Sequence, residues 1–227
     1  MGGRIYPGVK RALDIVGSAA MLLVLSPLLV PVAIVLRFTA EGEVFYTQTR
    51  IGRGGAEFGI WKFATMLKDS PNLGTGSLTV TGDPRVTKVG RVLRATKVNE
   101  LPQLINVLTG DMSFVGPRPQ VRGDFEAYTP EVRAAIGAVT PGITGIGSIV
   151  FRDEQTLLSR DGIDPRALSS EQLAPYQGAL EAWYLGRRSL WTDARIVAIT
   201  AWAVLVPSSQ LVFRAFPDLP PKPDWFD

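Results

Sequence analysis

The chain has 227 residues, of which 46% are hydrophobic and 20% charged, as expected for one folded domain with an anchor. It contains no cysteine, which excludes disulfides, thiol nucleophiles and thiolate metal ligands. It also contains no histidine, which excludes imidazole bases and imidazole metal ligands. Any chemistry must therefore use carboxylates, hydroxyls, Lys, Arg and a hard metal ion. The net charge of +3 fits an anionic partner, but nucleic acid, anionic lipid and nucleotide sugars all satisfy it.

The first feature along the chain is an apolar segment. Residues 15–36 carry no charge and are long enough to cross a hydrocarbon core of about 30 Å. A cleaved secretory signal is disfavoured because the apolar run is too long and the rest of the chain has no cysteine that would indicate an oxidising compartment. We therefore expect a membrane segment.

The prolines and flanking charges of this segment bear on how it enters the membrane. Pro27 and Pro31 each remove a backbone donor, so a bend near the middle is expected. Lys10 and Arg11 flank one end and Arg37 flanks the other, so the positive-inside rule gives no orientation for a straight span. A re-entrant helical hairpin that enters and leaves on the cytoplasmic side satisfies both observations. The alternative is a kinked helix that crosses once.

The rest of the chain is expected to form a small, mostly helical α/β domain. We place the membrane unit at 1–40 and a cytoplasmic catalytic domain with interfacial helices at 41–227. Alternating patterns predict strands at 44–50 and 57–63, and the glycine-rich turn at 52–55 would join them as a hairpin.

Turn-forming residues and periodic segments divide the remainder into loops and helices. Glycine, proline, serine and asparagine predict loops at 70–82, 110–119 and 141–147. Helices are expected at 85–96, 100–108, 120–128, 130–136, 171–187 and 192–206. The apolar stretch 196–206 is too short to span a bilayer and suits either a core helix or one in the membrane interface.

A basic residue recurs at every third position in Arg85, Lys88, Arg91, Arg94 and Lys97. On an α-helix this spacing drifts by about 60° per step, so the charges wrap the helix. Most of them are expected to be solvated or to rest on anionic headgroups. For Arg94 we favour a phosphate contact, because a guanidinium offers a planar fork of donors. A nucleic-acid binder is disfavoured because aromatic residues are not interleaved with the series.

Two further segments offer charged groups in defined local settings. Glu100 is expected in the first turn of a helix, with Asn99 as its N-cap and Pro102 in a tolerated early position. This explains both residues structurally, yet the helix dipole there also favours phosphate or a hard cation bridged to Glu100. Arg118 lies between two prolines that stiffen its backbone. It suits either an anion contact or an ordinary proline turn with a surface arginine.

Together these pieces resemble the monotopic phosphoglycosyl transferases, the bacterial sugar transferase family. The resemblance covers nearly the whole chain. The motifs that carry it are, in chain order, Lys10, Arg11 and Asp14, then Ser26 and Pro27, residues 46–52 (YTQTRIG), 62–66 (KFATM), Asp83, Pro84 and Arg85, Gly90 and Arg91, and residues 99–104 (NELPQL), 106–108 (NVL), 110–119 (GDMSFVGPRP) and 141–145 (PGITG).

The resemblance implies a Mg²⁺-dependent enzyme at the cytoplasmic face of the bacterial inner membrane. In the family an aspartate attacks the β-phosphate of a UDP-sugar, UMP leaves, and polyprenyl (undecaprenyl) phosphate then takes the phosphosugar, which initiates glycan assembly. The implied partners are a UDP-sugar, polyprenyl phosphate and membrane lipid, without nucleic acid, and a homo-oligomer stays open.

The resemblance also implies roles for five residues. By position, Glu100 matches the second carboxylate of the catalytic dyad, which holds Mg²⁺. Lys62, Arg94 and Arg118 match basic residues of the substrate site, and Glu181 falls where a further acidic residue is expected there. Charge that builds up on a transferring phosphate would be stabilised by such fixed cations.

Two positions depart from the family pattern. Asn99 stands where the family has the nucleophilic aspartate, and Ala64 stands where Lys or Arg is common. An amide is neither a base nor a useful nucleophile, so Asn99 cannot form an acyl phosphate. The sequence therefore predicts a phosphoglycosyl transferase with a modified catalytic position. The alternative is an impaired member that binds nucleotide sugar or lipid without turnover.

Overall fold

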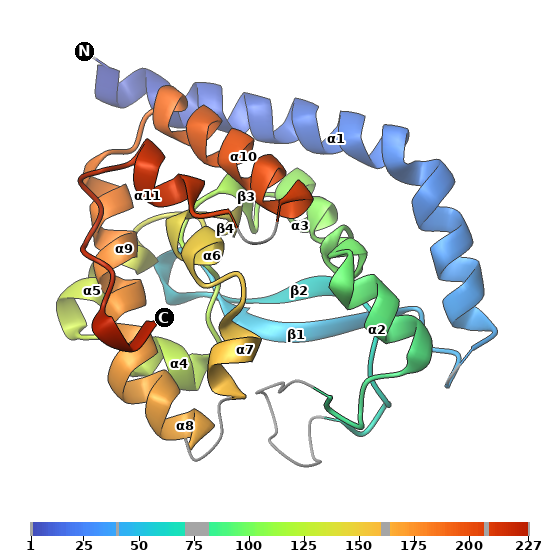
Figure 1. Cartoon of the computed structure of the whole chain (residues 1–227). Coiled ribbons are helices and arrows are strands. Elements are labelled where there is room, and N and C mark those ends of the chain that lie inside the picture. Colours follow the sequence, from blue (N-terminus) through green and yellow to red (C-terminus); the bar gives the residue numbers. More distant parts are fainter. Residues whose placement is uncertain (1, 40, 71–81, 160–163, 207–208, 227) are drawn as a thin grey trace.

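A computed structural model describes residues 2–39, 41–70, 82–159, 164–206 and 209–226 (Figure 1). The helices are α1 Gly2–Arg37, α2 Lys88–Ala95, α3 Gln103–Thr109, α4 Arg122–Glu126, α5 Pro130–Gly137, α6 Ile146–Val150, α7 Glu154–Leu158, α8 Pro165–Leu168, α9 Ala174–Gly186, α10 Leu190–Leu205 and α11 Leu211–Ala215. The strands are β1 Phe45–Ile51, β2 Glu57–Phe63, β3 Ser113–Val115 and β4 Gly142–Thr144. The mostly helical class expected from the sequence is confirmed.

The long helix α1 runs along one side of the molecule and leaves most of its apolar surface uncovered (Figure 1). The stretch Ile5–Arg37 is long and apolar enough to cross a membrane, and only 6% of its most apolar window is buried. A helix of 36 residues is about 54 Å long, well beyond the thickness of a hydrocarbon core. A helix this apolar and this uncovered requires lipid or another apolar cover.

Proline residues shape α1 without ending it. The helix continues through Pro7, Pro27 and Pro31 to Arg37, and Figure 1 shows it bending in its C-terminal half. Pro27 has no N–H to donate to the carbonyl of Leu23, and the Ser26 hydroxyl donates to that carbonyl instead, at 2.7 Å. The expected bend is present. The segment is one bent helix, and not two separate helices joined by a turn.

Both halves of α1 contact the same globular unit. In the first half, the Arg11 guanidinium donates to two backbone carbonyls near the end of α3, at 2.6 and 2.8 Å. Asp14 accepts a hydrogen bond from the backbone N–H of Phe114 at 3.0 Å. At the other end, Leu36 is buried in a small apolar cluster with Phe63 of β2. The bend therefore brings both ends of α1 onto one domain.

The hairpin expected near the N-terminus of the domain is confirmed. Strands β1 and β2 pair antiparallel, from Phe45 opposite Phe63 to Ile51 opposite Glu57. The amide of Asn106 in α3 extends this pairing, since it accepts from Trp61 N at 2.9 Å and donates to Gly59 O at 2.8 Å. Asn106 is 1% exposed, so the bond pair fixes α3 against β2 in a dry setting.

A second, two-stranded sheet was not expected. β3 and β4 pair in parallel, with Ser113 opposite Gly142 and Val115 opposite Thr144. The expected loops at 110–119 and 141–147 are therefore wrong where these strands lie. The two backbones approach so closely at Gly116 that a Cβ there would lie 2.6 Å from the Thr140 carbonyl oxygen. We predicted loops here from the glycine residues, whereas Gly116 permits the two strands to approach each other closely.

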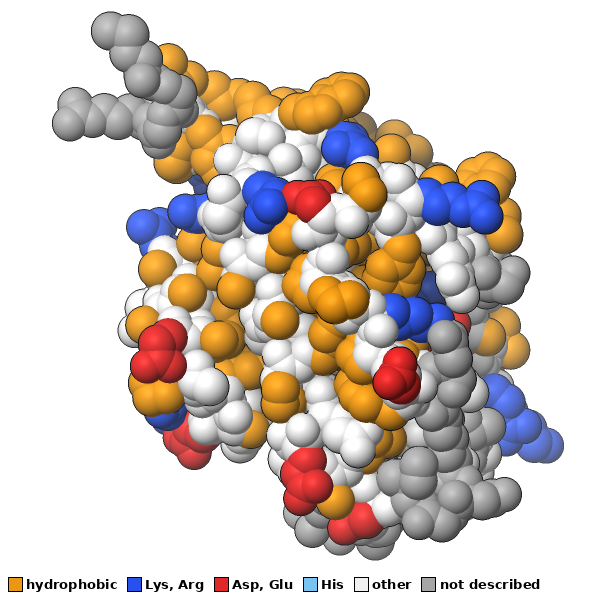
Figure 2. All heavy atoms as spheres, turned by 60° about the vertical axis from the view of Figure 1, so that its left-hand side comes forward, with side chains coloured by type: hydrophobic (Ala, Val, Ile, Leu, Met, Phe, Trp, Pro, Cys, Tyr) orange, Lys and Arg blue, Asp and Glu red, His pale blue; other side chains and the backbone are white. Residues whose placement is uncertain are grey.

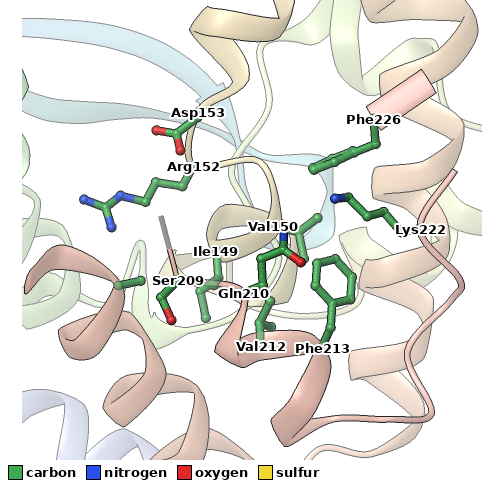
Figure 3. Close-up of a pocket in the computed structure, with 11 residues that line it drawn as sticks. Ile149, Val150, Arg152, Asp153, Ser209, Gln210, Val212, Phe213, Lys222 and Phe226 are labelled. Carbon is green, nitrogen blue, oxygen red and sulfur yellow. The ribbon is translucent and has the colours of Figure 1, made fainter. Parts of the chain in front are cut away.

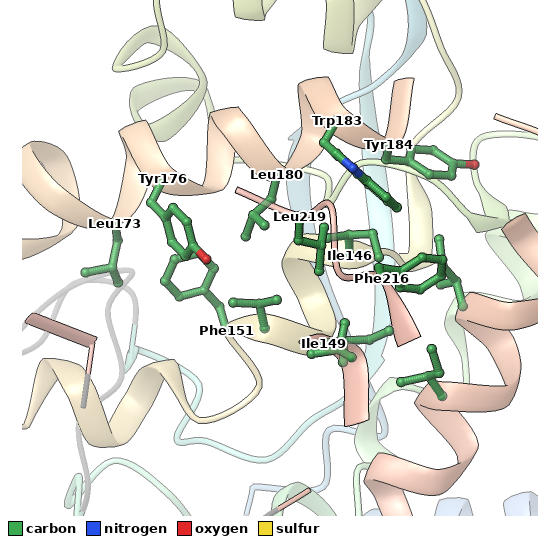
Figure 4. Close-up of a cluster of buried hydrophobic side chains, with 14 of the residues drawn as sticks. Ile146, Ile149, Phe151, Leu173, Tyr176, Leu180, Trp183, Tyr184, Phe216 and Leu219 are labelled. Atoms are coloured by element: carbon green, nitrogen blue, oxygen red, sulfur yellow. The ribbon is translucent and has the colours of Figure 1, made fainter. Parts of the chain in front are cut away.

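The largest core lies among α6, α9, α10 and α11 (Figure 4). Ile146, Leu180 and Ile196 are completely buried in it. α9 and α10 correspond to the expected helices at 171–187 and 192–206, whereas α6, α7, α8 and α11 were not expected. On its other face α10 exposes Trp202 and Leu205, so it is a core helix with an apolar outer surface. The expected loop at 70–82 lies mainly outside the described residues.

Candidate active site

The structure brings four of the predicted site residues together from four separate segments. Lys62 lies near the end of β2, Arg94 near the end of α2, Glu100 in the short 3₁₀ helix η3 (Val98–Glu100), and Arg118 after β3. Lys62 Nζ lies 3.9 Å from Glu100 Oε1. Burial raises the pKa of Glu100, but the charges of Lys62, Arg118, Lys97 and Arg94 outweigh it and the pKa is lowered. Within this group of four residues, Glu100 is therefore an ionised carboxylate beside three cations.

The chain reaches Glu100 through an unusual backbone turn. Lys97 adopts a left-handed conformation with φ 59°, which ends α2 and redirects the chain into η3. The expected helix at 100–108 starts later, because α3 begins at Gln103. Asn99 is consequently not the N-cap of α3, and that prediction is wrong. Its side chain is instead buried within η3, with 6% exposure.

Arg94 is held by a tightly packed α2. Its Nε donates to Thr65 Oγ1 at 3.0 Å, and Nη2 lies 3.7 Å from Met66 Sδ. A Cβ at Gly90 would collide with the Thr65 carbonyl oxygen, so glycine permits this close contact between α2 and the segment after β2. Thr87 caps α2 by accepting from Gly90 N at 2.9 Å. The guanidinium is therefore aimed before any ligand arrives.

The basic series does not lie on one helix as the sequence suggested. α2 starts at Lys88, so Arg85 precedes it. Arg85 is 5% exposed and forms an ion pair with Asp83, Nη2 to Oδ2, at 2.6 Å. Lys88 and Arg91 are exposed, as expected for solvated positions. Arg94 alone points its partly buried side chain towards the Thr65 and Met66 segment.

Glu181 supports Arg118 from inside the core. This residue of α9 is 1% exposed, and its Oε1 accepts the backbone N–H of Arg118 at 3.3 Å. Within the described residues, Oε2 has no hydrogen-bond partner. Burial raises the pKa of Glu181 to about 8, against a smaller lowering by Arg118, so the carboxyl is largely neutral at pH 7. Its direct contact is with the protein backbone, and a contact with substrate stays a prediction.

Sequence reasoning missed Arg50, which lies on the same face of the hairpin as Lys62. Its Nη2 donates to Gln48 Oε1 at 2.6 Å and its Nη1 to the Pro119 carbonyl at 3.3 Å. Burial, and next the charge of Arg118, lower the pKa of Arg50 to about 10. Strand alternation could have found it, because positions 46, 48 and 50 share the face that includes Lys62.

The side chains of Asn99 and Glu100 decide whether the site could bind a hard cation such as Mg²⁺. Asn99 Oδ1 is buried and has no hydrogen-bond partner among the described residues, and it neighbours the ionised carboxylate of Glu100. Mg²⁺ is usually held by one or two carboxylates together with phosphate oxygens and water. In the described part of the chain no three His, Cys, Asp or Glu residues gather to hold a metal. The donor set fits Mg²⁺ shared with a phosphate ligand, and not a site built of protein groups alone.

Sequence comparisons with known proteins point to one family. The sequence model of the bacterial sugar transferase family matches residues 5–207. The chain is 38% identical over 201 residues to a UDP-glucose:undecaprenyl-phosphate glucose-1-phosphate transferase of Caulobacter vibrioides, covering 86% of this chain and 69% of the relative. A protein of the same name from Escherichia coli K12 is 37% identical, over 86% of this chain and 39% of its own length.

A shorter relative matches over most of its own length. The exopolysaccharide production protein PSS of Rhizobium leguminosarum is 36% identical, over 83% of this chain and 91% of the relative. Several of the other relatives are much longer, and the chain spans 44% of one from Aeromonas hydrophila. The resemblance drawn from the sequence motifs is confirmed.

Proposed function

The chain belongs to the bacterial sugar transferase family and is a transferase, and we propose that it moves a sugar-1-phosphate from a UDP-sugar to a polyprenyl phosphate, releasing UMP and initiating glycan assembly. The observation that carries the proposal is the cluster of Lys62, Arg94 and Arg118 around the carboxylate of Glu100. An excess of fixed cations suits a diphosphate better than a neutral sugar.

These cations suit stabilisation of a transferring phosphate because they are fixed in advance. Arg94 is held by Thr65, and the backbone of Arg118 is held by Glu181. Positive groups that are already aimed at developing charge need no reorganisation during the reaction. In phosphoryl transfer most of the catalysis comes from positioning and charge stabilisation. Lys62 of β2 and Arg50 of β1 would add positive charge from the β-hairpin.

Glu100 and the side-chain oxygen of Asn99 would hold Mg²⁺ together with the phosphate oxygens of the substrate. When bound, the ion would neutralise charge on those oxygens. Ionised Glu100 matches this role, since its neighbours lower its pKa.

Asn99 decides the route of the reaction. Its amide cannot form an acyl phosphate, so direct attack by the lipid phosphate is the route we favour. A lipid phosphate oxygen would form a bond to the β-phosphorus while the bond to the oxygen of UMP breaks, and UMP would leave with that electron pair. The other route makes Glu100 the nucleophile at the expense of its metal role.

The membrane arrangement that fits best is a re-entrant α1. Arg11 and Asp14 near one end and Leu36 near the other all contact the same domain. A helix that crossed the bilayer would separate its ends by the membrane thickness. Figure 2 shows hydrophobic side chains along the upper edge, where α1 lies, whereas acidic side chains lie mainly in the lower half of that face. We place the domain on the cytoplasmic face of the inner membrane, with α10 in the interface.

A second function is favoured by one observation, the burial of the Asn99 amide at the position where an acidic nucleophile is expected from the family resemblance. The chain would then bind nucleotide sugar or lipid without turnover. Binding of a UDP-sugar with no UMP release in the presence of lipid acceptor would identify this case.

The proposal is tested by screening UDP-sugars for UMP release with the full chain in lipid nanodiscs. UMP should appear only when undecaprenyl phosphate and Mg²⁺ are both present, and Glu100→Gln should abolish it. An exposed arginine on α4 offers the matched control, since Arg122→Gln removes a charge whose ion pairs are with Glu57 and Glu126 and not with Glu100. Absence of UMP with every UDP-sugar would refute turnover.

A further inference from the structure

A cavity of about 230 Å³ lies between α6, the end of α10, α11 and the C-terminal segment (Figure 3). Its middle is apolar and is lined by Ile149, Val150, Val212 and Phe213. Figure 3 shows Arg152 on one side of these residues and Lys222 with Phe226 on the other. None of these side chains belongs to the cluster of Lys62, Arg94, Glu100 and Arg118. The cavity therefore combines an apolar middle with a cation on each side.

In the described part of the structure, Arg152 provides an unpaired hydrogen-bond donor that a ligand could satisfy. Its Nη1 atom is buried and has no hydrogen-bond partner among the described residues. A buried guanidinium N–H without an acceptor is costly, and an anionic oxygen is its strongest partner. Asp153 lines the same end but is exposed, and no ion pair between it and Arg152 is present in the described structure. The cavity thus offers the Arg152 guanidinium to an anion.

The cavity continues towards the surface that would face lipid. A second hollow, lined by Trp202, Leu211 and Arg214 among others, shares Ser209 and Gln210 with the first. Trp202 is 48% exposed and Leu211 37% exposed, although both are apolar or amphipathic side chains. A long apolar chain could pass from the interface over these residues into the cavity.

One segment links the lining of the cavity to the cluster around Glu100. Arg152 lies two positions before Glu154, and the charge of Glu154 acts directly on Arg118. Burial lowers the pKa of Arg118, but Glu154 and Glu100 raise it more, which requires Glu154 to be near. An anion held by Arg152 would therefore lie on the side of the cavity that is nearer to the cluster.

We infer that this cavity binds the acceptor lipid, with Arg152 holding the phosphate of a polyprenyl phosphate and Val150, Val212 and Phe213 contacting its first isoprene units. The inference rests on the proposed function and assigns the acceptor half of its site. The volume is smaller than that of a whole small-molecule pocket, about 300 Å³ or more. It suits the head end of a long lipid whose remaining chain stays in the membrane.

The test is photolabelling with a short polyprenyl phosphate that carries a diazirine on its second isoprene unit. The full chain in nanodiscs is irradiated without any UDP-sugar, and labelled peptides are mapped by mass spectrometry. Label is expected within residues 149–153 and 209–213. Undecaprenyl phosphate should compete, whereas undecaprenol and inorganic phosphate at the same concentration should not. Label confined to other segments would overturn the inference, and so would equal competition by undecaprenol.

Variants test the role of Arg152 separately. Arg152→Gln should lower labelling about tenfold, as expected for loss of one charge-assisted contact, and Arg152→Lys should retain part of it. Arg122→Gln should label like the unmodified chain. In the UMP-release assay Arg152→Gln should raise the KM for lipid phosphate and leave the KM for UDP-sugar unchanged. Unchanged labelling in Arg152→Gln would refute the assignment of the phosphate to Arg152.

The design separates this inference from the proposed function. Labelling needs no nucleotide sugar and no turnover, so a correctly mapped label without UMP release would contradict the transferase activity and leave the lipid site standing. UMP release with label elsewhere would contradict the lipid site alone.

Discussion

Lys62 Nζ and Glu100 Oε1 lie 3.9 Å apart, and each side chain sets the electrostatic state of the other. Burial lowers the pKa of Lys62 to about 8, although Glu100 raises it, while Arg50, Arg118 and Arg94 lower it further. Lys62 in turn is the first of the charges that keep Glu100 ionised. A diphosphate entering this site would add negative charge and favour the protonated amine.

We predict that kcat/KM falls as the pH rises through about 8. The protonated Lys62 attracts phosphate, and the pH profile of kcat/KM reports groups of the free enzyme. UMP release measured between pH 6 and 10 checks this. Lys62→Arg should move the decline to higher pH, because a guanidinium stays protonated, although its maximal rate should be lower. A decline at the same pH in Lys62→Arg would assign the titration to another group.

Glu100→Gln should abolish Mg²⁺-dependent UMP release while the protein stays folded and membrane-bound. The neutral amide is a weaker ligand for a hard cation, and the expected loss is on the order of 100-fold or more. The measurement is UMP release over a range of Mg²⁺ concentrations, with circular dichroism to verify folding. Normal turnover of Glu100→Gln at limiting Mg²⁺ would show that Glu100 does not bind the metal.

Local sequence patterns were sufficient for several parts of the fold. The hairpin follows from alternation over two short segments joined by a glycine turn, and its pairing involves neighbours in sequence. α1 and its bend follow from an uncharged apolar run with Pro27 in its middle. Lys62, Glu100 and Arg118 could be named because they lie in motifs that resemble a family. Arg94 was named from its place in that resemblance and from its guanidinium group. Nothing in the spacing of the four residues showed that they meet.

Other parts depend on contacts between distant segments. β3 and β4 have three residues each, and each is a strand only because it pairs with the other, which is distant in the sequence. The close approach of their backbones at Gly116 has no local signal, so the local sequence pattern predicted a loop there. The burial of Asn99 depends on the left-handed turn at Lys97, a conformation that lysine rarely adopts. The contact between Glu181 and the backbone of Arg118 requires α9 to pack against the segment after β3.

The membrane arrangement gives a third prediction. Cysteines placed singly at Gly3 and Glu41 should react equally with a membrane-impermeant thiol reagent applied from the cytoplasmic side. The chain has no cysteine of its own, so each variant carries a single reporter. Both halves of α1 contact one domain, which favours both ends on one side. Opposite accessibility of the two positions would establish a crossing helix.

Glu181 gives a prediction about stability. A carboxyl whose folded pKa is raised to about 8 binds a proton that the unfolded chain has already lost above about 4.3. Between these values the folded state holds more protons, so its contribution to stability falls as the pH rises towards 8. Glu181→Gln should flatten this dependence in thermal unfolding measured from pH 5 to 9, and should keep activity.

A matched variant isolates the hydrogen bond. Glu181→Leu removes the acceptor for the Arg118 N–H and should lower the free energy of unfolding by about 1–3 kcal/mol. It should also lower kcat by misplacing Arg118. Equal activity in the Gln and Leu variants would show that Arg118 needs no support from this residue.

Asn99 gives the last prediction, which concerns the route of phosphate transfer. If the lipid phosphate attacks directly, the unmodified chain mixed with UDP-sugar and no acceptor should form no covalent phosphosugar adduct at position 99. Asn99→Asp should give a trapped adduct and a burst of UMP, because a carboxylate then occupies the buried position beside Glu100. Intact mass spectrometry of both forms, followed by peptide mapping, distinguishes the routes. An adduct on Glu100 in the unmodified chain would exclude direct attack. Failure of Asn99→Asp to form any adduct would show that position 99 does not face the β-phosphate.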